Sequence, residues 1–302
     1  MLRSMLFLIV LLNCSLNTNA QEFIPLWPES KMPNSKGLKV EEIIENERIT
    51  QVDVPGIYTF FPPKEENKSC AVIICPSGGY DHLTYISGGF QLAKWFNTIG
   101  VTAFVLKYRL PTSPDLIEPD KAPLQDVQRS MRIIRANAPK WGIQQNKIGV
   151  MGTSAGGHLA STLATHCEDV SAICDSLDKI SFHPDFLILV SPVTSMGTYT
   201  HAGSRNKLLG ANPSKELIEK YSNESHVTPE TPPSFIVHAA NDKSVNPRNS
   251  IMFFEALIEH NVSACLHIFP QGAHSISLHN NPGSTKLWPS LCEMWLKETG
   301  FI

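Results

Sequence analysis

One short stretch of the sequence has a residue pattern suited to nucleophilic chemistry. Gly152-Thr153-Ser154-Ala155-Gly156 matches G-x-S-x-G, follows the apolar residues 148–151 and precedes a run rich in alanine and glycine. This context predicts a strand, a sharp turn with the serine at its apex, and then a helix. The glycines allow neighbouring chains to approach the turn closely. We therefore predict that Ser154 is a nucleophile, in preference to a glycine-rich turn without chemistry.

A serine hydroxyl needs a base to take its proton, and the base is usually a histidine held by a carboxylate. In a strand–turn–helix setting, the carboxylate and then the histidine follow the serine along the chain. Asp242 comes directly after a predicted strand at 234–239, and His274 comes after one at 264–269. Because ligands bind at the carboxyl ends of parallel strands, we expect both side chains to meet Ser154 there.

Both choices have competitors in the sequence. An aspartate after an asparagine often binds the backbone of its own turn, which is the alternative role for Asp242. His267 lies inside a predicted strand, and His158 lies on the predicted helix after the serine, so packing is expected for both. His260 follows a helix and His279 lies in a loop, so neither comes directly after a strand.

Attack on a carbonyl creates an oxyanion, which needs backbone N–H donors. Ala155 follows the predicted nucleophile and supplies one donor. We expect the second in Pro76-Ser77-Gly78-Gly79-Tyr80, where Gly78 and Gly79 have no Cβ to obstruct the substrate. The alternative for this segment is a simple turn. Tyr80 then either borders the substrate pocket, as a binding residue, or fills the core.

The elements that must position these residues alternate along the chain. Strands separated by helices predict an α/β fold with a mostly parallel, doubly wound sheet and helices on both faces. The first two strands are joined by Pro55-Gly56 and are expected to form an antiparallel N-terminal edge. Residues 21–47 are expected to be irregular, and the long segment 191–233 is expected to cover a site. Strands are predicted at 48–54, 57–61, 71–75, 101–108, 147–152, 186–190, 234–239 and 264–269, and helices at 89–98, 124–138, 155–166, 247–259 and 285–299.

The N-terminus has the layout of a secretory signal peptide. Arg3 precedes an apolar run, and small or polar residues end at Ala20, which predicts cleavage before Gln21. We expect residues 1–20 to be this signal and residues 21–302 to form a single catalytic domain that is secreted or periplasmic in a bacterium. A lipid anchor at Cys14 is the second choice, because bulky Asn13 stands where a small residue is expected.

Composition restricts the partners of the chain. The net charge is −3 and no block of lysine and arginine occurs, which argues against nucleic acid and anionic membranes. After the N-terminus, no apolar run is long enough to insert into a membrane.

Of the seven cysteines, all except Cys14 belong to the expected mature chain. Cys167 and Cys174 form the most plausible bridge, and the alternative is that all six are buried free thiols. Cys70 and Cys75 lie an odd number of residues apart on one strand, so they are expected to face opposite sides of the sheet. No cysteine or histidine spacing suggests zinc or another metal.

Almost all of the mature chain resembles the secreted bacterial branch of the α/β-hydrolase esterase/lipase family, near the acetyl-xylan-esterase-like enzymes. The resemblance implies an α/β-hydrolase fold and a serine carboxylesterase that needs no cofactor. It also implies Ser154, Asp242 and His274 as catalytic residues, with the oxyanion site at Gly78, Gly79 and Ala155. The matching segments are Ile74-Cys75-Pro76-Ser77-Gly78-Gly79-Tyr80, Val105-Leu106-Lys107-Tyr108-Arg109-Leu110-Pro111, Asp126 with Arg129, residues 151–160, Asn241-Asp242 and Gly272-Ala273-His274.

The expected activity is hydrolysis of short-chain, chiefly acetyl, esters on carbohydrates such as acetylated xylan. A small-molecule or polysaccharide ester is therefore the expected partner. A feruloyl or general short-chain carboxylesterase is the alternative. A prolyl-oligopeptidase-type peptidase ranks lower, since those enzymes usually carry a large β-propeller for which this chain has no room.

Overall fold

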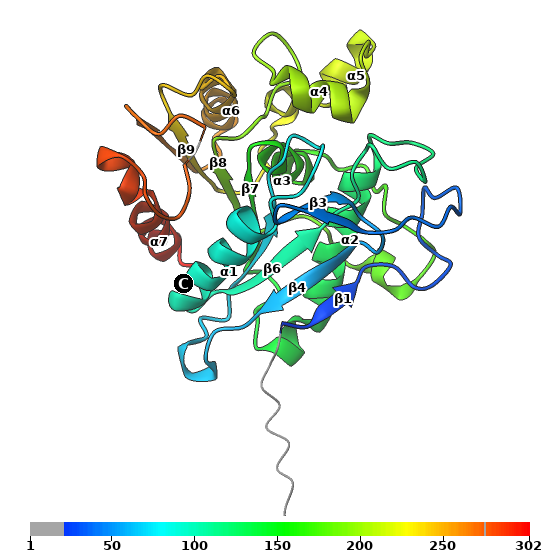
Figure 1. The fold of residues 1–302 in the computed structure, drawn as a ribbon. Coiled ribbons are helices and arrows are strands. Elements are labelled where there is room, and N and C mark those ends of the chain that lie inside the picture. Colours follow the sequence, from blue (N-terminus) through cyan, green and yellow to red (C-terminus); the bar gives the residue numbers. More distant parts are fainter. Residues whose placement is uncertain (1–20, 275) are drawn as a thin grey trace, which may run out of the picture.

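The computed structural model describes residues 21–274 and 276–302, so the predicted signal peptide at 1–20 and Cys14 lie outside the described residues. An eight-stranded sheet forms the centre of the molecule (Figure 1). β4 pairs antiparallel with β1 and with β6, whereas the neighbouring pairs from β6 onward are parallel. In spatial order the strands are β1 (Phe23–Pro25), β4 (Gly56–Phe60), β6 (Thr102–Lys107), β5 (Ala71–Cys75), β7 (Ile148–Thr153), β8 (Leu187–Val190), β9 (Ser234–Ala239) and β10 (Ala264–Phe269).

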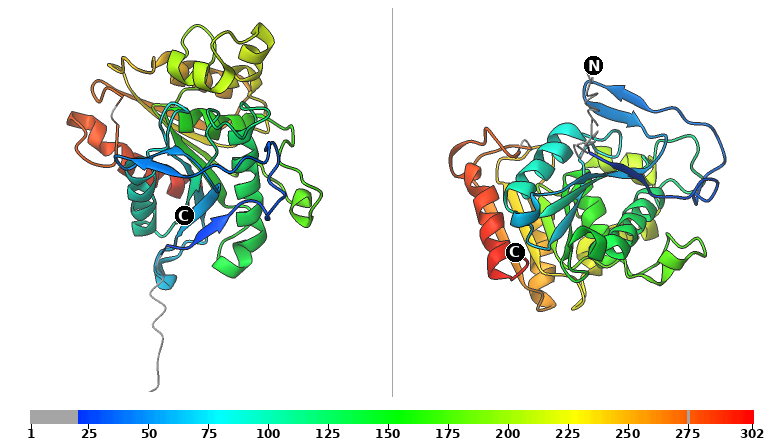
Figure 2. Two further views of the ribbon diagram at one scale, coloured as in Figure 1. Left: turned by 45° about the vertical axis from the view of Figure 1, so that its right-hand side comes forward. Right: turned by 90° about the horizontal axis from the view of Figure 1, so that it is seen from below.

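Helices cover both faces of this sheet (Figure 2). α1 (Gln91–Thr98) and α7 (Trp288–Glu298) pack on one face, and α2 (Ala122–Asn137), α3 (Ala155–Thr165) and α6 (Arg248–Glu259) pack on the other. Side chains alternate along a strand, so strands buried on both faces must be apolar throughout, as Ala71–Cys75 is. None of the described helices has the length and apolarity to span a membrane. Shorter helices are α4 (Ala202–Leu209), α5 (Lys215–Lys220) and the single turns Lys64–Glu66, Ile86–Phe90, Ala138–Trp141, Ser176–Lys179, Asn223–His226 and Gly283–Leu287.

The predicted doubly wound sheet and its antiparallel N-terminal edge are confirmed, but the strands of that edge differ from the prediction. β3 (Arg48–Gln51) pairs with β2 (Ile43–Glu45) in a separate two-stranded sheet, while β4 pairs with β1. The prediction that the first two strands pair with each other was therefore wrong, as was the irregular segment 21–47. β1 and β2 have three residues each, which is too short to show a periodic pattern.

The segment 191–233 has no strand, as predicted, but it contains the short helices α4 and α5 and the turn Asn223–His226. It is fastened to α3 by buried hydrogen bonds. The Asn223 amide donates to the backbone oxygen of His158 and to the hydroxyls of Ser161 and Thr162. His158 Nε2 donates to the backbone oxygen of Tyr221 at 2.9 Å. The helix that follows the predicted nucleophile is thereby tied to this segment.

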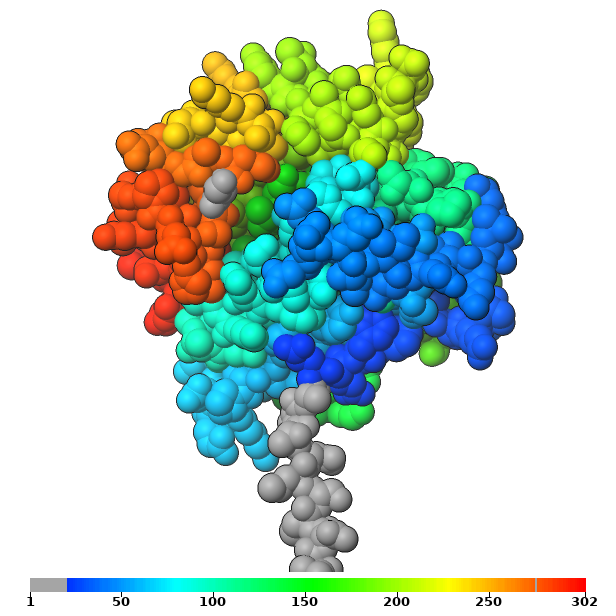
Figure 3. All heavy atoms as spheres, in the orientation of Figure 1, coloured from blue at the N-terminus to red at the C-terminus, as the bar shows by residue number. Residues whose placement is uncertain are grey.

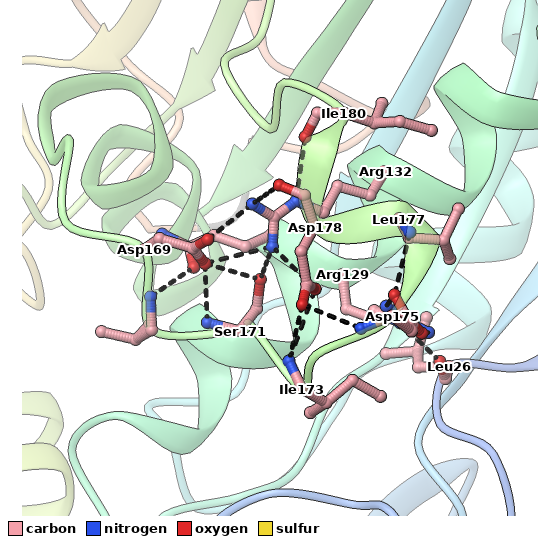
Figure 4. A network of polar contacts seen from close by, with 12 residues as sticks. Leu26, Arg129, Arg132, Asp169, Ser171, Ile173, Asp175, Leu177, Asp178 and Ile180 are labelled. Carbon is pink, nitrogen blue, oxygen red and sulfur yellow. Dashed lines mark hydrogen bonds and ion pairs between the residues drawn. The ribbon is translucent and has the colours of Figure 1, made fainter.

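The loop between α3 and β8 is held by a row of buried arginines on α2 (Figure 4). Arg129 pairs with Asp175, and Arg132 pairs with Asp169 and donates to the Ser171 hydroxyl. These guanidinium groups neutralise carboxylates of the loop. Without a cationic partner, moving these carboxylates from water to a buried helix face would cost free energy. The neighbouring Asp126 of the same helix pairs with Arg109, which follows β6, and not with Arg129. Positions three residues apart on one helix face therefore anchor different segments of the chain.

The six cysteines within the described residues are free thiols. The predicted Cys167–Cys174 bridge was therefore wrong: both thiols are exposed, in the loop that the arginines of α2 already hold. Cys70 and Cys75 belong to the cores on opposite faces of the sheet, as predicted.

Candidate active site

The turn between β7 and α3 places Ser154 in a strained conformation. Its φ of 57° and ψ of −122° lie in a region that side chains other than glycine rarely adopt. Two close approaches make this turn possible. A Cβ on Gly152 would lie 2.0 Å from the oxygen of Gly156, and a Cβ on Gly156 would lie 2.1 Å from the oxygen of Cys75. The predicted strand–turn–helix is thus present, with the serine at its apex.

The three residues predicted to act together are in contact. The Ser154 hydroxyl lies 2.9 Å from Nε2 of His274, and Nδ1 of His274 lies 2.7 Å from Oδ2 of Asp242. A carboxylate only accepts hydrogen bonds, so Nδ1 carries the proton and Nε2 is free to accept from the serine. His274 is 25% exposed, whereas the side chain of Asp242 is fully buried. They come from the ends of β7, β9 and β10, which is the edge predicted from the sequence.

Asp242 is held by four donors. Oδ1 accepts from the backbone N–H groups of Ser244 and Val245, and Oδ2 accepts from His274 and from Nε2 of His238 at 3.2 Å. Burial alone would raise the pKa of Asp242, but these hydrogen bonds outweigh it and hold that pKa far below its usual range. Asp242 is therefore an anion at any pH at which the protein is expected to work.

The glycine-rich loop after β5 lies against the first turn of α3, which follows Ser154. Gly78 has a φ of 134° and Gly79 a φ of 66°, and a Cβ on Gly78 would lie 1.8 Å from the oxygen of His82. Only glycine fits at that position. Within residues 21–274 and 276–302, the backbone N–H groups of Gly79 and Ala155 have no protein acceptor. They are therefore available to a substrate oxygen.

A cavity of about 350 Å³ adjoins His274. In the space-filling view the surface is hollowed between cyan and orange parts of the chain, with green residues at the floor (Figure 3). The cavity combines apolar walls with several hydroxyl groups. Its lining residues are Ser77, Thr84, Ser87, Gly88, Leu92, Met151, Thr153, Val190, His274, Ile276, Ser277, Leu278 and Trp288.

Tyr80 does not line that cavity. Its side chain is 1% exposed, and its hydroxyl donates to Nδ1 of His158 at 2.8 Å. Of the two roles considered for Tyr80, the structure therefore supports core packing and not substrate binding. Burial lowers the pKa of His158 to about 4, so this imidazole is neutral and can accept the bond. The glycine-rich loop is in this way fixed to α3.

Sequence reasoning missed two histidines near the site. His238 lies on β9 and contacts Asp242. It is a polar residue in an otherwise apolar buried strand, four residues before the aspartate, and that exception was the available signal. His201 precedes α4, and its pKa is lowered by burial and by the charge of nearby His274. Nothing in its local sequence indicates this proximity.

The described residues contain no group of three or more histidine, cysteine, aspartate or glutamate side chains placed to hold a metal ion. A serine at a strained turn, linked to a histidine and an aspartate at the ends of a doubly wound sheet, is the arrangement of an α/β-hydrolase. The fold and the site together define this class.

A family model confirms the class and narrows it. The BD-FAE model matches residues 57–257. The chain belongs to this family of α/β-hydrolase esterases. A crystal structure of an acetyl ester-xyloside bifunctional hydrolase from Caldicellulosiruptor lactoaceticus superposes with a TM-score of 0.80 at 35% identity, covering 93% of this chain and 97% of that one.

Two longer proteins contain a similar region. Endo-1,4-beta-xylanase B of Butyrivibrio fibrisolvens is 36% identical over 228 residues, which are 76% of this chain and 35% of that protein. Acetylxylan esterase of Xylanibacter ruminicola is 34% identical over 209 residues, which are 68% of this chain and 40% of that protein. The chain therefore spans less than half the length of either relative.

Proposed function

We propose that the chain is a serine carboxylesterase that removes short acyl groups, chiefly acetyl, from carbohydrates such as acetylated xylan. The observation that carries this proposal is the continuous hydrogen-bonded path from Ser154 through His274 to Asp242. The cavity beside it supports a carbohydrate ester, because several of its lining side chains bear hydroxyl groups. The acetylxylan esterase and the acetyl ester-xyloside hydrolase among the relatives support the same substrate class.

The proposed reaction has two steps. Ser154 Oγ attacks the ester carbonyl while Nε2 of His274 takes its proton, and the N–H groups of Gly79 and Ala155 bind the oxyanion. Gly78 gives the loop the conformation that presents Gly79. The C–O bond of the ester then breaks, and His274 returns the proton to the alcohol as it leaves. Water, activated by His274, attacks the acyl-enzyme, and the acid leaves as Ser154 is regenerated.

An ester panel on the purified mature chain tests this function. Acetylated xylan, monosaccharide acetates and p-nitrophenyl acetate are expected to be hydrolysed, and long-chain p-nitrophenyl esters are expected to react poorly. Feruloyl esters test the alternative acyl group. Release of ferulate with no release of acetate would overturn the acetyl assignment, and cleavage of prolyl peptides without ester cleavage would overturn the esterase.

The nucleophile is tested by Ser154→Ala. We expect a folded protein whose kcat on p-nitrophenyl acetate falls by roughly four orders of magnitude or more, because the acyl-enzyme cannot form. Ser130→Ala is the matched control, since Ser130 is a buried serine of α2 bonded to the backbone of Val127. Turnover by Ser154→Ala close to that of the control would contradict the assignment.

Export is a further part of the proposal. A signal peptide at residues 1–20 would deliver the enzyme to the periplasm or the medium, where polysaccharide esters are degraded. N-terminal sequencing of the protein secreted by a bacterial host is expected to begin at Gln21. A start at Met1, or a lipid-modified Cys14, would contradict it.

A further inference from the structure

A second histidine lies behind the proposed catalytic aspartate. His238 is on β9 and is 0% exposed. Its Nε2 lies 3.2 Å from Oδ2 of Asp242 and 3.1 Å from the backbone oxygen of Val245, and its Nδ1 lies 2.7 Å from the hydroxyl of Ser250 on α6. Five side chains thus form an unbroken path from Ser154 to the buried Ser250 of α6.

The partners of His238 determine which of its nitrogens carries a proton. Both neighbours of Nε2 are oxygens that can only accept, so Nε2 must donate. If Nδ1 were also protonated, Ser250 would accept that bond, and its own hydroxyl proton would need another acceptor. Within the described part of the chain, the Ser250 hydroxyl has no partner other than Nδ1. His238 is therefore a neutral imidazole with the proton on Nε2, and Ser250 donates to Nδ1.

We propose that His238, fixed in its tautomer by Ser250, is a positioning residue of the hydrolase reaction that orients Asp242 and reduces the negative charge Asp242 presents to His274. This inference rests on the proposed function. His238 touches neither the substrate nor the reacting atoms, and no proton moves through it. Its effect comes from sharing Oδ2, the same oxygen that His274 uses.

Sharing one oxygen has two physical consequences. The N–H of His238 and the two backbone N–H groups on Oδ1 fix the plane of the carboxylate, so that its bond to His274 is aimed along one direction. Charge drawn towards His238 also weakens the attraction between Asp242 and a protonated His274. His274 then releases its proton more readily between catalytic steps. His201, from the segment 191–233, also interacts electrostatically with Asp242 and His274, so it is kept unchanged in the test.

Two substitutions at one position separate positioning from packing. His238→Gln retains an N–H donor at about the reach of Nε2, whereas His238→Leu removes it. For His238→Leu we expect kcat on p-nitrophenyl acetate to fall about 10- to 100-fold with KM changed little, which corresponds to one lost charge-assisted hydrogen bond. The acidic limb of the kcat/KM profile is expected to move to higher pH. His238→Gln is expected to restore most of kcat and the original limb.

His166→Leu is the matched control. His166 is also buried and hydrogen-bonded, to the backbone oxygen of Lys220, but it does not contact Asp242. The His166→Leu variant is expected to have a lower free energy of unfolding and an unchanged acidic limb in its kcat/KM profile. Rates are normalised to the concentration of active sites, titrated with a phosphonylating reagent, so that loss of folded protein does not count as loss of kcat.

The outcomes distinguish this inference from the proposed function. If the wild-type chain hydrolyses no ester, the proposed function fails. If the wild type is active and Ser154→Ala is not, but His238→Leu keeps its kcat and its pH profile, the positioning role alone is wrong. The positioning role is also overturned if the acidic limb of the kcat/KM profile moves equally in His238→Gln and His238→Leu.

A spectroscopic measurement tests the tautomer of His238 without relying on catalytic activity. The ¹⁵N chemical shifts of the histidine side chains are expected to include one neutral Nε2–H imidazole at neutral pH that disappears in His238→Gln or, if that variant is unstable, changes in Ser250→Ala. An imidazolium or an Nδ1–H tautomer at His238 would overturn the inference.

Discussion

The charge of Asp242 is distributed among more donors than the orientation of one imidazole requires. Two backbone N–H groups and two histidines share its oxygens. In a site of this kind, the carboxylate keeps the proton of its histidine on the nitrogen that faces away from the serine. The atom that faces Nδ1 of His274 must therefore accept a hydrogen bond, and this requirement is as important as the position of the atom.

Replacing Asp242 by asparagine exchanges an accepting oxygen for a group that can also donate. The amide nitrogen can donate to Nδ1 of His274, which favours a proton on Nε2 and leaves no base for Ser154. We expect kcat/KM at neutral pH to fall by roughly four orders of magnitude, with the fold retained in circular dichroism. The check is steady-state kinetics on p-nitrophenyl acetate. A loss of less than tenfold would show that Asp242 has the local turn role considered for it in the sequence.

At this scale the sequence predicts residues that follow strand ends better than residues inside strands. Ser154, Asp242 and His274 could be found because each comes just after a strand, where chain order limits the choices. His238 could not be assigned a partner, because alternation gives the face of a strand and not the contacts of a side chain. The role of Tyr80 could not be decided from the sequence for a related reason. The direction of its side chain depends on a φ of 62°, which the packing of the whole loop determines.

Among the elements, α2 anchors the loop between α3 and β8 through its buried arginines. Arg132 is 2% exposed, and its guanidinium donates to Asp169, to Ser171 and to the backbone oxygens of Asp178 and Ile180 (Figure 4). The partners lie in a loop that has a single short helical turn, Ser176–Lys179. The loop thus depends on the helix for its conformation.

Replacing Arg132 by methionine keeps much of the buried volume and removes every one of those donors. We expect the free energy of unfolding to fall by about 3 kcal/mol, because a carboxylate and buried carbonyls lose their partner. Urea denaturation followed by tryptophan fluorescence measures this change. Glu293→Gln is the control, since Glu293 forms an exposed pair with Lys297 and is expected to change stability by about 0.5 kcal/mol or less. Equal effects of the two substitutions would contradict the argument.

The elements that the sequence predicted well are those with long apolar or periodic patterns. The strands at 234–239 and 264–269 match their predicted bounds, and the core helices differ from theirs by a few residues. The helices of the segment 191–233 were missed, because α4 has few apolar residues and α5 has six residues in all. The end of α5 is held by tertiary hydrogen bonds of Lys220 and Tyr221 to His166 and His158, which local propensity does not reveal.

On the scale of the molecule, two buried histidines make stability depend on pH. Burial lowers the pKa of His158 and of His166 to about 4, and their hydrogen bonds to the segment 191–233 use the neutral imidazole. In the unfolded chain each titrates near 6.5. Between these pH values the unfolded state binds more protons, so acid favours unfolding.

We therefore expect the free energy of unfolding to fall as the pH is lowered from about 6.5 towards 4, by up to about 1.4 kcal/mol per pH unit for each histidine. Above pH 6.5 these two residues contribute no pH dependence. Urea denaturation at several pH values measures the slope, and His166→Gln is expected to reduce it. An unchanged slope in that variant would mean that His166 is not held neutral in the folded protein.

The ends of the described chain lie at the pole of the sheet away from the cavity. Glu22 bonds to Thr59 near the amino end of β6, and the carbonyls of Gly300 and Phe301 accept from Lys147, which precedes β7. Ser154 and His274 follow the opposite, carboxyl ends of the strands. A second module fused before Gln21 or after Ile302 would thus be attached at the side opposite the cavity, which would stay open. Such a geometry suits modular assembly, because a fused neighbour would not obstruct access to Ser154 and His274.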